Sequence, residues 1–309
     1  MYNVQKSNIK EDNFLTQLAV RYENNEFVGD QLFPIMPVKK ESDYYRVFSK
    51  DGWFTGAPKK ADGAHTEEAT LAYSYGTYSC YERAIKDIVT ERAMQNADAP
   101  VRPKIDTTNF LTEKVRLSRE LDQWILAVGT SGLNQAGYRT VGTATTAWQD
   151  GTAPDILGDL STAIKAISKA IGKRPNVIFF NTDVAEAIVQ DDKIVEIMKA
   201  HTTNMITGNG LPATLRNMRI QLTDALYNTS DPGNTEAYDY IISDNVVIAW
   251  VNPGHPLSFG RTFVSKNFLV RRWFDGDREG EFIKVNHVYS PKIMSLSSGY
   301  IITNTYNAS

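Results

Sequence analysis

Cysteine and long apolar runs are nearly absent from this chain of 309 residues. The one cysteine, Cys80, cannot form a disulfide within the chain, and such sparse use of cysteine suits a reducing compartment. The longest aliphatic run, residues 246–251, is far too short to cross a bilayer, and the first residues form no apolar targeting segment. We therefore expect a soluble protein that is made inside a cell.

An excess of basic residues is also absent. The 33 Lys and Arg are outnumbered by 36 Asp and Glu, which gives a formal net charge of −3. Dedicated nucleic-acid-binding domains usually carry a clear basic excess, so this balance argues against that class. It does not exclude a wall that merely encloses nucleic acid. With 42% hydrophobic residues, the chain can bury a sizeable core and form one large domain or two interleaved ones.

Catalytic and metal-binding motifs are missing too. The histidines are His65, His201, His255 and His287. They are far apart in the sequence, and none has the spacing of a two-histidine metal site. Residues 129–132 (GTSG) superficially resemble a nucleophile elbow but follow a predicted helix instead of a strand. Cys80 ends an alternating strand pattern, which predicts a small packed side chain and not a reactive thiol. We expect no catalytic residue, no cofactor and no metal, and a protein that is not an enzyme.

One segment has the start of a calcium loop. Residues 275–280 (DGDREG) place carboxylates at positions one, three and five and glycine at position six. The twelfth position is Asn286, where such a loop has glutamate, and strand-like residues replace the flanking helices. We interpret the segment as the turn of a long hairpin between strands at 262–274 and 281–289, with calcium binding as the alternative.

The most distinctive part of the chain is residues 27–81, which are built to reach away from a domain. In residues 27–38, Pro34 and Pro37 exclude a helix and favour extended backbone. Residues 44–48 are rich in aromatic and β-branched side chains and predict a strand.

The same segment then turns and comes back. Residues 49–66 are interrupted by three glycines and a proline, which predicts a long polar tip. Residues 67–81 alternate with the period of a strand, and Leu71, Tyr73 and Tyr75 share one of its faces. A two-stranded arm of this kind is marginal on its own. We expect it to lie on a neighbouring subunit.

A family resemblance begins within this segment. Residues 28–34 (VGDQLFP) lead into residues 37–42 (PVKKES) and then Tyr44 and Tyr45. This series resembles the start of the major capsid proteins of tailed bacteriophages, which share the Hong Kong 97-like fold. The order of elements that follows is similar to that family over nearly the whole chain, as is the closing segment, residues 298–304 (SGYIITN). The resemblance implies an α+β fold of that type.

The resemblance also implies a division of the chain into parts. These are an N-terminal arm at 1–37, an extended two-stranded loop (E-loop) at 38–81, a peripheral (P) domain with a long spine helix at 82–154 and 258–293, and an α/β axial (A) domain at 155–257 and 294–309. Within the N-terminal arm, a short apolar stripe predicts a segment or short helix that docks elsewhere. The stripe consists of Phe14, Leu15, Leu18 and Val20.

Periodicity predicts the elements of the peripheral part. Residues 82–97 have helical spacing. Residues 107–128 predict the longest helix, about 33 Å long, with Asp106 as its N-cap. Its apolar face consists of Phe110, Leu117, Leu121, Trp124, Ile125 and Val128. Residues 129–154 predict a loop.

The axial part has the pattern of an α/β unit. A helix at 155–171 ends at Gly172, and a buried strand follows at 177–180. Asn181 is placed to cap the next helix, and another short helix follows it. The last third of the chain predicts strands at 238–251, 262–274, 281–289 and 299–304.

The function that the resemblance implies is structural. Proteins of this family self-assemble into hexamers and pentamers of an icosahedral phage head, which encloses double-stranded DNA without sequence-specific binding. The resemblance implies location in the virion after synthesis in the host bacterial cytoplasm, with no membrane partner. Further implied partners are a portal, a decoration protein and a separate scaffolding protein, since no long charged helical segment precedes residue 27.

Two other functions stay open. An encapsulin-type nanocompartment has the same fold and packages a cargo enzyme, and a soluble α/β enzyme could carry a site that shows no motif. The length of the chain and the motif at 28–34 favour the phage capsid over the nanocompartment.

The candidate contacts between subunits lie on the arm. They are Lys59, Lys60, Tyr73, Tyr75, Trp53 and Phe54. We expect the tyrosines to be buried on an adjacent subunit and the lysines at the tip to meet carboxylates of a neighbour. Some relatives join an arm lysine to an asparagine of a neighbour, with a glutamate as base. Lys50, Lys59 and Lys60 occupy the corresponding region, and nothing in the sequence fixes the other two residues.

Overall fold

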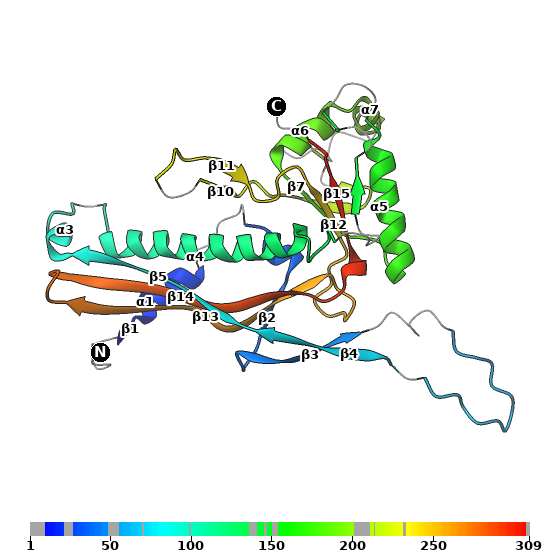
Figure 1. The fold of residues 1–309 in the computed structure, drawn as a ribbon, viewed down its shortest axis with the longest axis horizontal. Helices are drawn as coiled ribbons and strands as arrows, with labels where there is room; N and C mark the ends of the chain where they lie inside the picture. The colour runs from blue at the N-terminus through cyan, green and yellow to red at the C-terminus, as the bar shows by residue number, and fades with distance from the viewer. Residues whose placement is uncertain are drawn as a thin grey trace.

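The computed structural model describes residues 10–21, 27–48, 56–69, 71–98, 100–135, 141–144, 147–149, 154–200, 211–212, 214–230 and 233–306. It has a mixed α and β architecture with two main parts (Figure 1). One part is elongated and places a long helix along a sheet of long strands. The other part is more compact and places helices around a second sheet. A thin two-stranded arm projects from the elongated part.

The elongated part is a five-stranded sheet covered by helix α4 (Pro103–Val128). Its strands are β1 (Lys10–Glu11), β2 (Ile35–Pro37), β5 (Tyr81–Thr90), β13 (Gly260–Asp275) and β14 (Gly280–Ile293). The expected long hairpin is confirmed, because β13 and β14 pair in antiparallel register from Gly260 opposite Ile293 to Asp275 opposite Gly280. The segment weighed as a calcium loop is therefore the turn of this hairpin, in which the Asp277 N–H donates to Asp275 Oδ1 over 3.1 Å. Among the described residues, no three His, Cys, Asp or Glu side chains gather closely enough to hold a metal ion.

Helix α4 is confirmed, but its start and its buried face differ from the prediction. It begins at Pro103, which loses nothing at the first helical position because that N–H has no helical partner. Asp106 is not the N-cap; it lies in the first turn and accepts the Arg102 N–H over 3.1 Å.

The predicted apolar face of α4 is only partly correct: Trp124 is fully buried, whereas Phe110 and Ile125 are 53% and 65% exposed. The buried residues of the helix are instead a mixed polar and apolar set. They are Thr108, Leu111, Thr112, Val115, Arg119, Glu120, Gln123, Trp124 and Ala127. The rest of the prediction failed because Arg119, Glu120 and Gln123 are buried through polar partners on other elements, which hydrophobicity alone does not reveal.

The helix predicted at 82–97 is wrong. Most of that segment is strand β5, which pairs with β14 from Tyr81 opposite Tyr289 to Thr90 opposite Gly280, and only α3 (Glu91–Gln95) is helical. A long strand partner distant in the sequence overrides the local spacing, and the β-branched residues of the segment suit a strand. Val89 is 4% exposed and packs in the core beneath α4.

The compact part is a six-stranded sheet in the order β6-β15-β12-β7-β9-β8. Its strands are β6 (Val141–Thr143), β7 (Val177–Phe180), β8 (Thr214–Leu215), β9 (Met218–Leu222), β12 (Val246–Ala249) and β15 (Gly299–Thr303). The helices beside it are α5 (Ile156–Ile171), α6 (Thr182–Gln190) and α7 (Asp192–Ala200). All four residues of β7 are buried, as expected.

Local signals in the compact part are confirmed. Gly172 ends α5 in the left-handed conformation with φ of 65°, and the Asn181 side chain caps α6 by accepting the Val184 N–H over 3.0 Å. Two predictions fail. The expected loop at 129–154 contains β6, which pairs with β15, and the strand expected at 238–251 is two strands, β11 (Tyr238–Tyr240) and β12, separated by a turn. β11 forms a separate hairpin with β10 (Leu226–Asn228).

The N-terminal stripe forms helix α1 (Asn13–Arg21), which docks on the elongated part of its own chain. Leu15 and Ala19 are buried in the core beneath α4, whereas Phe14 is 64% exposed. No helix in the described ranges is long and apolar enough to cross a membrane.

Candidate assembly surface

The arm is the antiparallel pair β3 (Ser42–Phe48) and β4 (Tyr73–Ser79), which projects beyond the elongated sheet (Figure 1). The register runs from Ser42 opposite Ser79 to Phe48 opposite Tyr73. The strand predicted at 44–48 is confirmed, and the one predicted at 67–81 is confirmed only over Tyr73–Ser79. Residues 56–69 of the tip are exposed and have no regular secondary structure. At the far end of β3, Phe48 packs against the core of the compact part, and its ring lies 6.2 Å from that of Tyr73.

One face of the arm carries exposed aromatic side chains. Tyr44, Tyr73 and Tyr75 are 70%, 44% and 62% exposed, and we name them the arm tyrosine face. Their rings meet edge to face, with centroids 6.4 Å apart for Tyr44 and Tyr75 and 5.5 Å apart for Tyr73 and Tyr75. The Arg46 guanidinium lies 4.8 Å from the centre of the Tyr73 ring. Clustered exposed aromatic side chains of this kind are typical of interaction surfaces.

The opposite face fixes the root of the arm to the domain. The ring of Tyr78 stacks on Phe263 with centroids 4.4 Å apart, and Tyr45 packs on the same ring at 5.4 Å. Gly76 lies against Tyr45, where a Cβ atom would come within 2.6 Å of the ring. Cys80 is 8% exposed in the same cluster, and burial raises the pKa of its thiol. The expectation that Cys80 is a packed side chain is confirmed.

The other predicted contact residues lie toward the tip. Lys59 and Lys60 are exposed. Trp53 and Phe54 lie outside the described residues, as does Lys50. The structure thus brings Tyr73 and Tyr75 together on one face and leaves the two lysines further along the arm.

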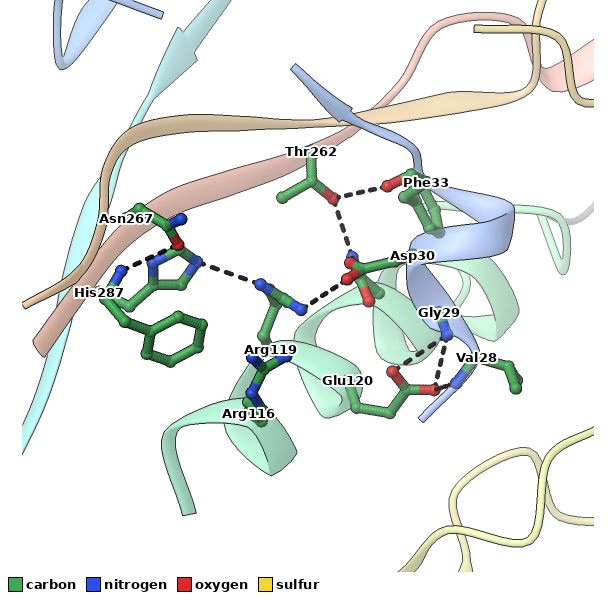
Figure 2. A network of polar contacts seen from close by, with 12 residues as sticks. Val28, Gly29, Asp30, Phe33, Arg116, Arg119, Glu120, Thr262, Asn267 and His287 are labelled. Atoms are coloured by element: carbon green, nitrogen blue, oxygen red, sulfur yellow. Dashed lines mark hydrogen bonds and ion pairs between the residues drawn. The ribbon is translucent and has the colours of Figure 1, made fainter. Parts of the chain in front are cut away.

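Behind the arm, the 28–34 motif docks on α4 through a buried polar network (Figure 2). Its first turn is helix α2 (Gly29–Leu32), so the expectation that the prolines exclude any helix from 27–38 is wrong. The turn forms because the Glu120 carboxylate accepts its first N–H groups, from Val28 over 3.0 Å and from Gly29 over 2.8 Å. The chain becomes extended only after it, in β2.

Glu120 is central to this docking. Its carboxylate also accepts the Trp124 indole N–H over 2.7 Å. Burial raises the pKa of Glu120 to about 7, and the three N–H donors oppose that rise. Gly29 is required by the close approach, since a Cβ atom there would lie 2.2 Å from Gln123 Oε1 and 2.8 Å from Glu120 Oε2.

Asp30 continues the network across the sheet. It accepts Arg119 Nη2 over 2.5 Å and Gln123 Nε2 over 2.9 Å, and Gln123 also donates to Thr262 Oγ1 over 2.9 Å. Arg119 Nη1 lies 3.3 Å from Nε2 of His287 on β14. Burial and the nearby Arg119 charge lower the pKa of His287 to about 3, so its ring is neutral and accepts the guanidinium N–H.

The network therefore connects α2, α4, β13 and β14, and it holds the 28–34 motif against α4. The motif also inserts Leu32 and Phe33, both fully buried, and the ring of Phe33 packs 5.4 Å from that of Phe259. The sequence did not predict a role for Arg119, Glu120 and Gln123. The available signal was their spacing, which places three polar side chains on one face of a predicted helix.

The fold and this surface can now be compared with known proteins. No protein-family model matches the chain. The major capsid protein of Burkholderia phage BcepMu is 22% identical over 303 residues, which cover 94% of this chain and 95% of that protein. A crystal structure of a phage-related protein from Bordetella bronchiseptica superposes with a TM-score of 0.74 and 21% identity, covering 96% of this chain and 97% of that one. The mature capsid of bacteriophage PhiM1 gives a TM-score of 0.61 with 10% identity, covering 91% and 87%.

The chain has the phage major capsid fold. The predicted resemblance and the α+β class are thereby confirmed over nearly the whole chain. An encapsulin from Synechococcus elongatus is also similar, with a TM-score of 0.56 and 14% identity over 96% of this chain and 95% of that one. That value is lower than those of the two structures above, and the similar sequence is that of a phage major capsid protein, so the comparisons together favour the phage capsid over the nanocompartment.

Proposed function

We propose that this protein is the major capsid subunit of a tailed phage. Many copies assemble as hexamers and pentamers into an icosahedral head that encloses double-stranded DNA, and the protein resides in the virion. The observation that carries the proposal is the arm tyrosine face, which is exposed on a chain of capsid fold. Its role is structural and not enzymatic, and its surfaces exist to meet other copies.

In this proposal, each part of the fold corresponds to a part of a capsid subunit. The arm is the E-loop, α4 is the spine helix of a peripheral domain built on β5, β13 and β14, and the six-stranded sheet with α5, α6 and α7 is the axial domain. Residues 1–37 form the N-terminal arm. We assign β6 to the axial domain, because it pairs with β15, which moves that boundary ahead of residue 155.

The energy of assembly comes from many weak contacts. Burial of the arm tyrosine face on an adjacent subunit contributes roughly 25 cal/mol per Å² of apolar area, before the cost of association. A closed shell repeats each contact in every copy, so a modest contact is sufficient. Lys59 and Lys60 extend the same contact by meeting carboxylates of the neighbour. A separate scaffolding protein, a portal and a decoration protein complete the proposed partners.

Electron microscopy of the purified protein tests the proposal. The wild type is expected to form uniform closed particles or capsomer rings. The double variant Y73S/Y75S is expected to remain in small species, because it removes two rings from the face without touching the root of the arm. The matched control is Y73F/Y75F, which keeps the ring area and should assemble. A wild-type protein that stays monomeric at high concentration with a protease-resistant arm contradicts the proposal.

The contents of the particles distinguish the phage capsid from the second candidate, an encapsulin-type shell. Particles isolated from the natural source should contain double-stranded DNA if the protein is a phage capsid subunit. A packaged cargo enzyme without a genome would favour the encapsulin-type shell.

A further inference from the structure

Charges around the six-stranded sheet are segregated along the chain. Residues 160–182 contain Lys165, Lys169, Lys173 and Arg174 and no acidic residue. Residues 220–260 contain Asp224, Asp231, Glu236, Asp239 and Asp244 and no Lys or Arg. The first stretch includes most of α5, and the second includes the β10–β11 hairpin. Figure 1 shows α5 on one flank of this part and the hairpin projecting from the other flank, above α4.

The basic flank contains a groove of about 530 Å³ between α5 and the turn that joins β8 to β9. We name it the basic groove. It is lined by Ser161, Ile164, Lys165, Ser168, Arg174 and Arg216. Arg216 is held over α5 by a backbone of positive φ, 55°, and by donation to the Ser161 hydroxyl. Ser168 Oγ is buried and has no hydrogen-bond partner among the described residues.

The cations of the basic groove are uncompensated. Within the described part of the chain, Lys165, Arg174 and Arg216 have no carboxylate partner. Other basic residues of the chain do have one, such as Arg271 with Glu11 at 3.1 Å and Arg272 with Asp12 at 2.9 Å. The groove therefore presents three cations, an apolar side chain and an unused hydroxyl to whatever lies against it.

The β10–β11 hairpin, which we name the acidic hairpin, has the complementary character. Leu226 and Tyr238 are 49% and 58% exposed on it. Glu236 and Asp239 are exposed beside them, and the Tyr238 hydroxyl donates to Glu236 over 2.5 Å. A two-stranded hairpin is marginal alone and gains stability when it packs on another surface.

The base of the acidic hairpin is also negative. Asp183, Glu186 and Asp224 gather there, and burial together with the charges of Glu186 and Asp224 raises the pKa of Asp183. No cation of the described residues pairs with these three carboxylates. The whole flank thus lacks the positive charge that the opposite flank has in excess.

We propose that the acidic hairpin of one copy docks on the basic groove of the next copy around the capsomer ring. The inference rests on the proposed function, since a ring of identical subunits joins two different surfaces of each copy. Here those two surfaces lie on opposite flanks and have opposite charge, which fixes the direction of the ring and speeds association. Glu236 and Asp239 face Lys165 and Arg216, and Leu226 and Tyr238 cover Ile164.

Charge reversal tests the pairing in nuclease-treated protein that contains no DNA. The variants are K165E/R216E in the groove, E236K/D239K in the hairpin, and all four changes in one chain. Each double variant is expected to lower the yield of rings or particles at least about tenfold. A loss of about 1.4 kcal/mol already lowers the association constant of one contact tenfold, and the ring repeats that loss at every contact. The fourfold variant restores opposite charges across the contact and is expected to regain most of the yield. Circular dichroism and thermal unfolding verify that every variant folds.

Each result bears on a different claim. A wild type that forms no ring or particle contradicts the proposed function itself. Normal assembly of both double variants overturns the pairing and leaves the proposed function intact. Loss in both without recovery in the fourfold variant also overturns the pairing. If K165E/R216E assembles normally but binds DNA more weakly than the wild type, the groove holds DNA phosphates and the pairing is wrong.

Discussion

Two adjacent segments of this chain, residues 28–34 and the β3–β4 arm, place similar residues in opposite environments. The motif at 28–34 buries Leu32 and Phe33 completely and pairs Asp30 with Arg119, whereas the arm leaves Tyr44 and Tyr75 mostly exposed. The motif therefore stabilises the single subunit. In the proposed assembly, the exposed aromatic surface of the arm instead stabilises the contact with another copy. Substitutions in the two segments should separate folding from assembly.

The largest expected effect on the subunit comes from breaking the Asp30–Arg119 pair. Arg119 is 7% exposed, so D30A leaves a buried guanidinium without its carboxylate and should lower the free energy of unfolding by about 3 kcal/mol. The matched control is E41A, which breaks the exposed pair of Glu41 with Lys266 and should cost far less, because solvent screens that pair. Urea unfolding of the monomer measures both. Equal costs for the two variants would contradict the role of the network.

A smaller loss of subunit stability is expected when a substitution pushes the 28–34 motif away from α4. G29A places a methyl group where Gln123 and Glu120 already lie, so it should destabilise the subunit by about 2 kcal/mol through overpacking. G56A is the matched control, because nothing lies within 4 Å of a Cβ atom at that position on the arm. Thermal unfolding should show a lower Tm for the first variant only. A normal Tm for G29A would mean that the motif docks less tightly than the structure has it.

The pH dependence of stability provides a third test of the network. Between about pH 4.5 and 7 the folded chain keeps a proton on Glu120 that the unfolded chain releases, so this group makes stability fall as pH rises. Between about pH 3 and 6.5 the unfolded chain binds a proton on His287 that the folded chain excludes, so this group makes stability rise with pH. Relative to E120Q, the wild type should lose up to about 1.4 kcal/mol per pH unit on going from pH 5 to 7.

The variant H287F isolates the contribution of His287 to the pH dependence of stability in the same way. Relative to this variant, the wild type should gain stability as pH rises from 4 to 6, which is the opposite sign. Urea unfolding at a series of pH values measures both differences. Parallel pH profiles for the wild type and the two variants would show that neither group changes its protonation on folding.

The smallest effect on the subunit is expected in the arm. Y75S should change the free energy of unfolding of the monomer by less than about 0.5 kcal/mol, because the ring is 62% exposed and lies against the exposed rings of Tyr44 and Tyr73. The same variant should nevertheless assemble poorly, because Tyr75 belongs to the proposed contact between subunits. A large loss of monomer stability would mean that the tyrosine face belongs to the subunit core and not to a contact between subunits.

The sequence predicts those elements whose signals are local. Gly172 and Asn181 mark the ends of helices α5 and α6, and the acidic turn at 275–280 marks the β13–β14 hairpin. Strand β5 could not be predicted in the same way, since its partner β14 is about two hundred residues away and only that pairing overrides the helical spacing of 82–97.

The residues of the candidate site also divide into those with a local sequence signal and those without one. Tyr73 and Tyr75 alternate within one strand, so their common face was predictable, whereas Tyr44 joins it only through the pairing of β3 with β4. The buried side of α4 was not, because Arg119, Glu120 and Gln123 are polar and become core residues only through partners on α2, β13 and β14. Their burial depends on contacts that no local pattern contains.

Hydroxyl-radical footprinting of the tyrosines, before and after assembly, tests most directly that the arm finds its cover on another copy. In the free subunit, Tyr44, Tyr73 and Tyr75 should be oxidised readily and Tyr78, which is 6% exposed, should be protected. On assembly the first three should become protected while Tyr78 stays unchanged. If the three tyrosines are equally reactive in both states, or are already protected in the dilute monomer, the account of the arm is wrong.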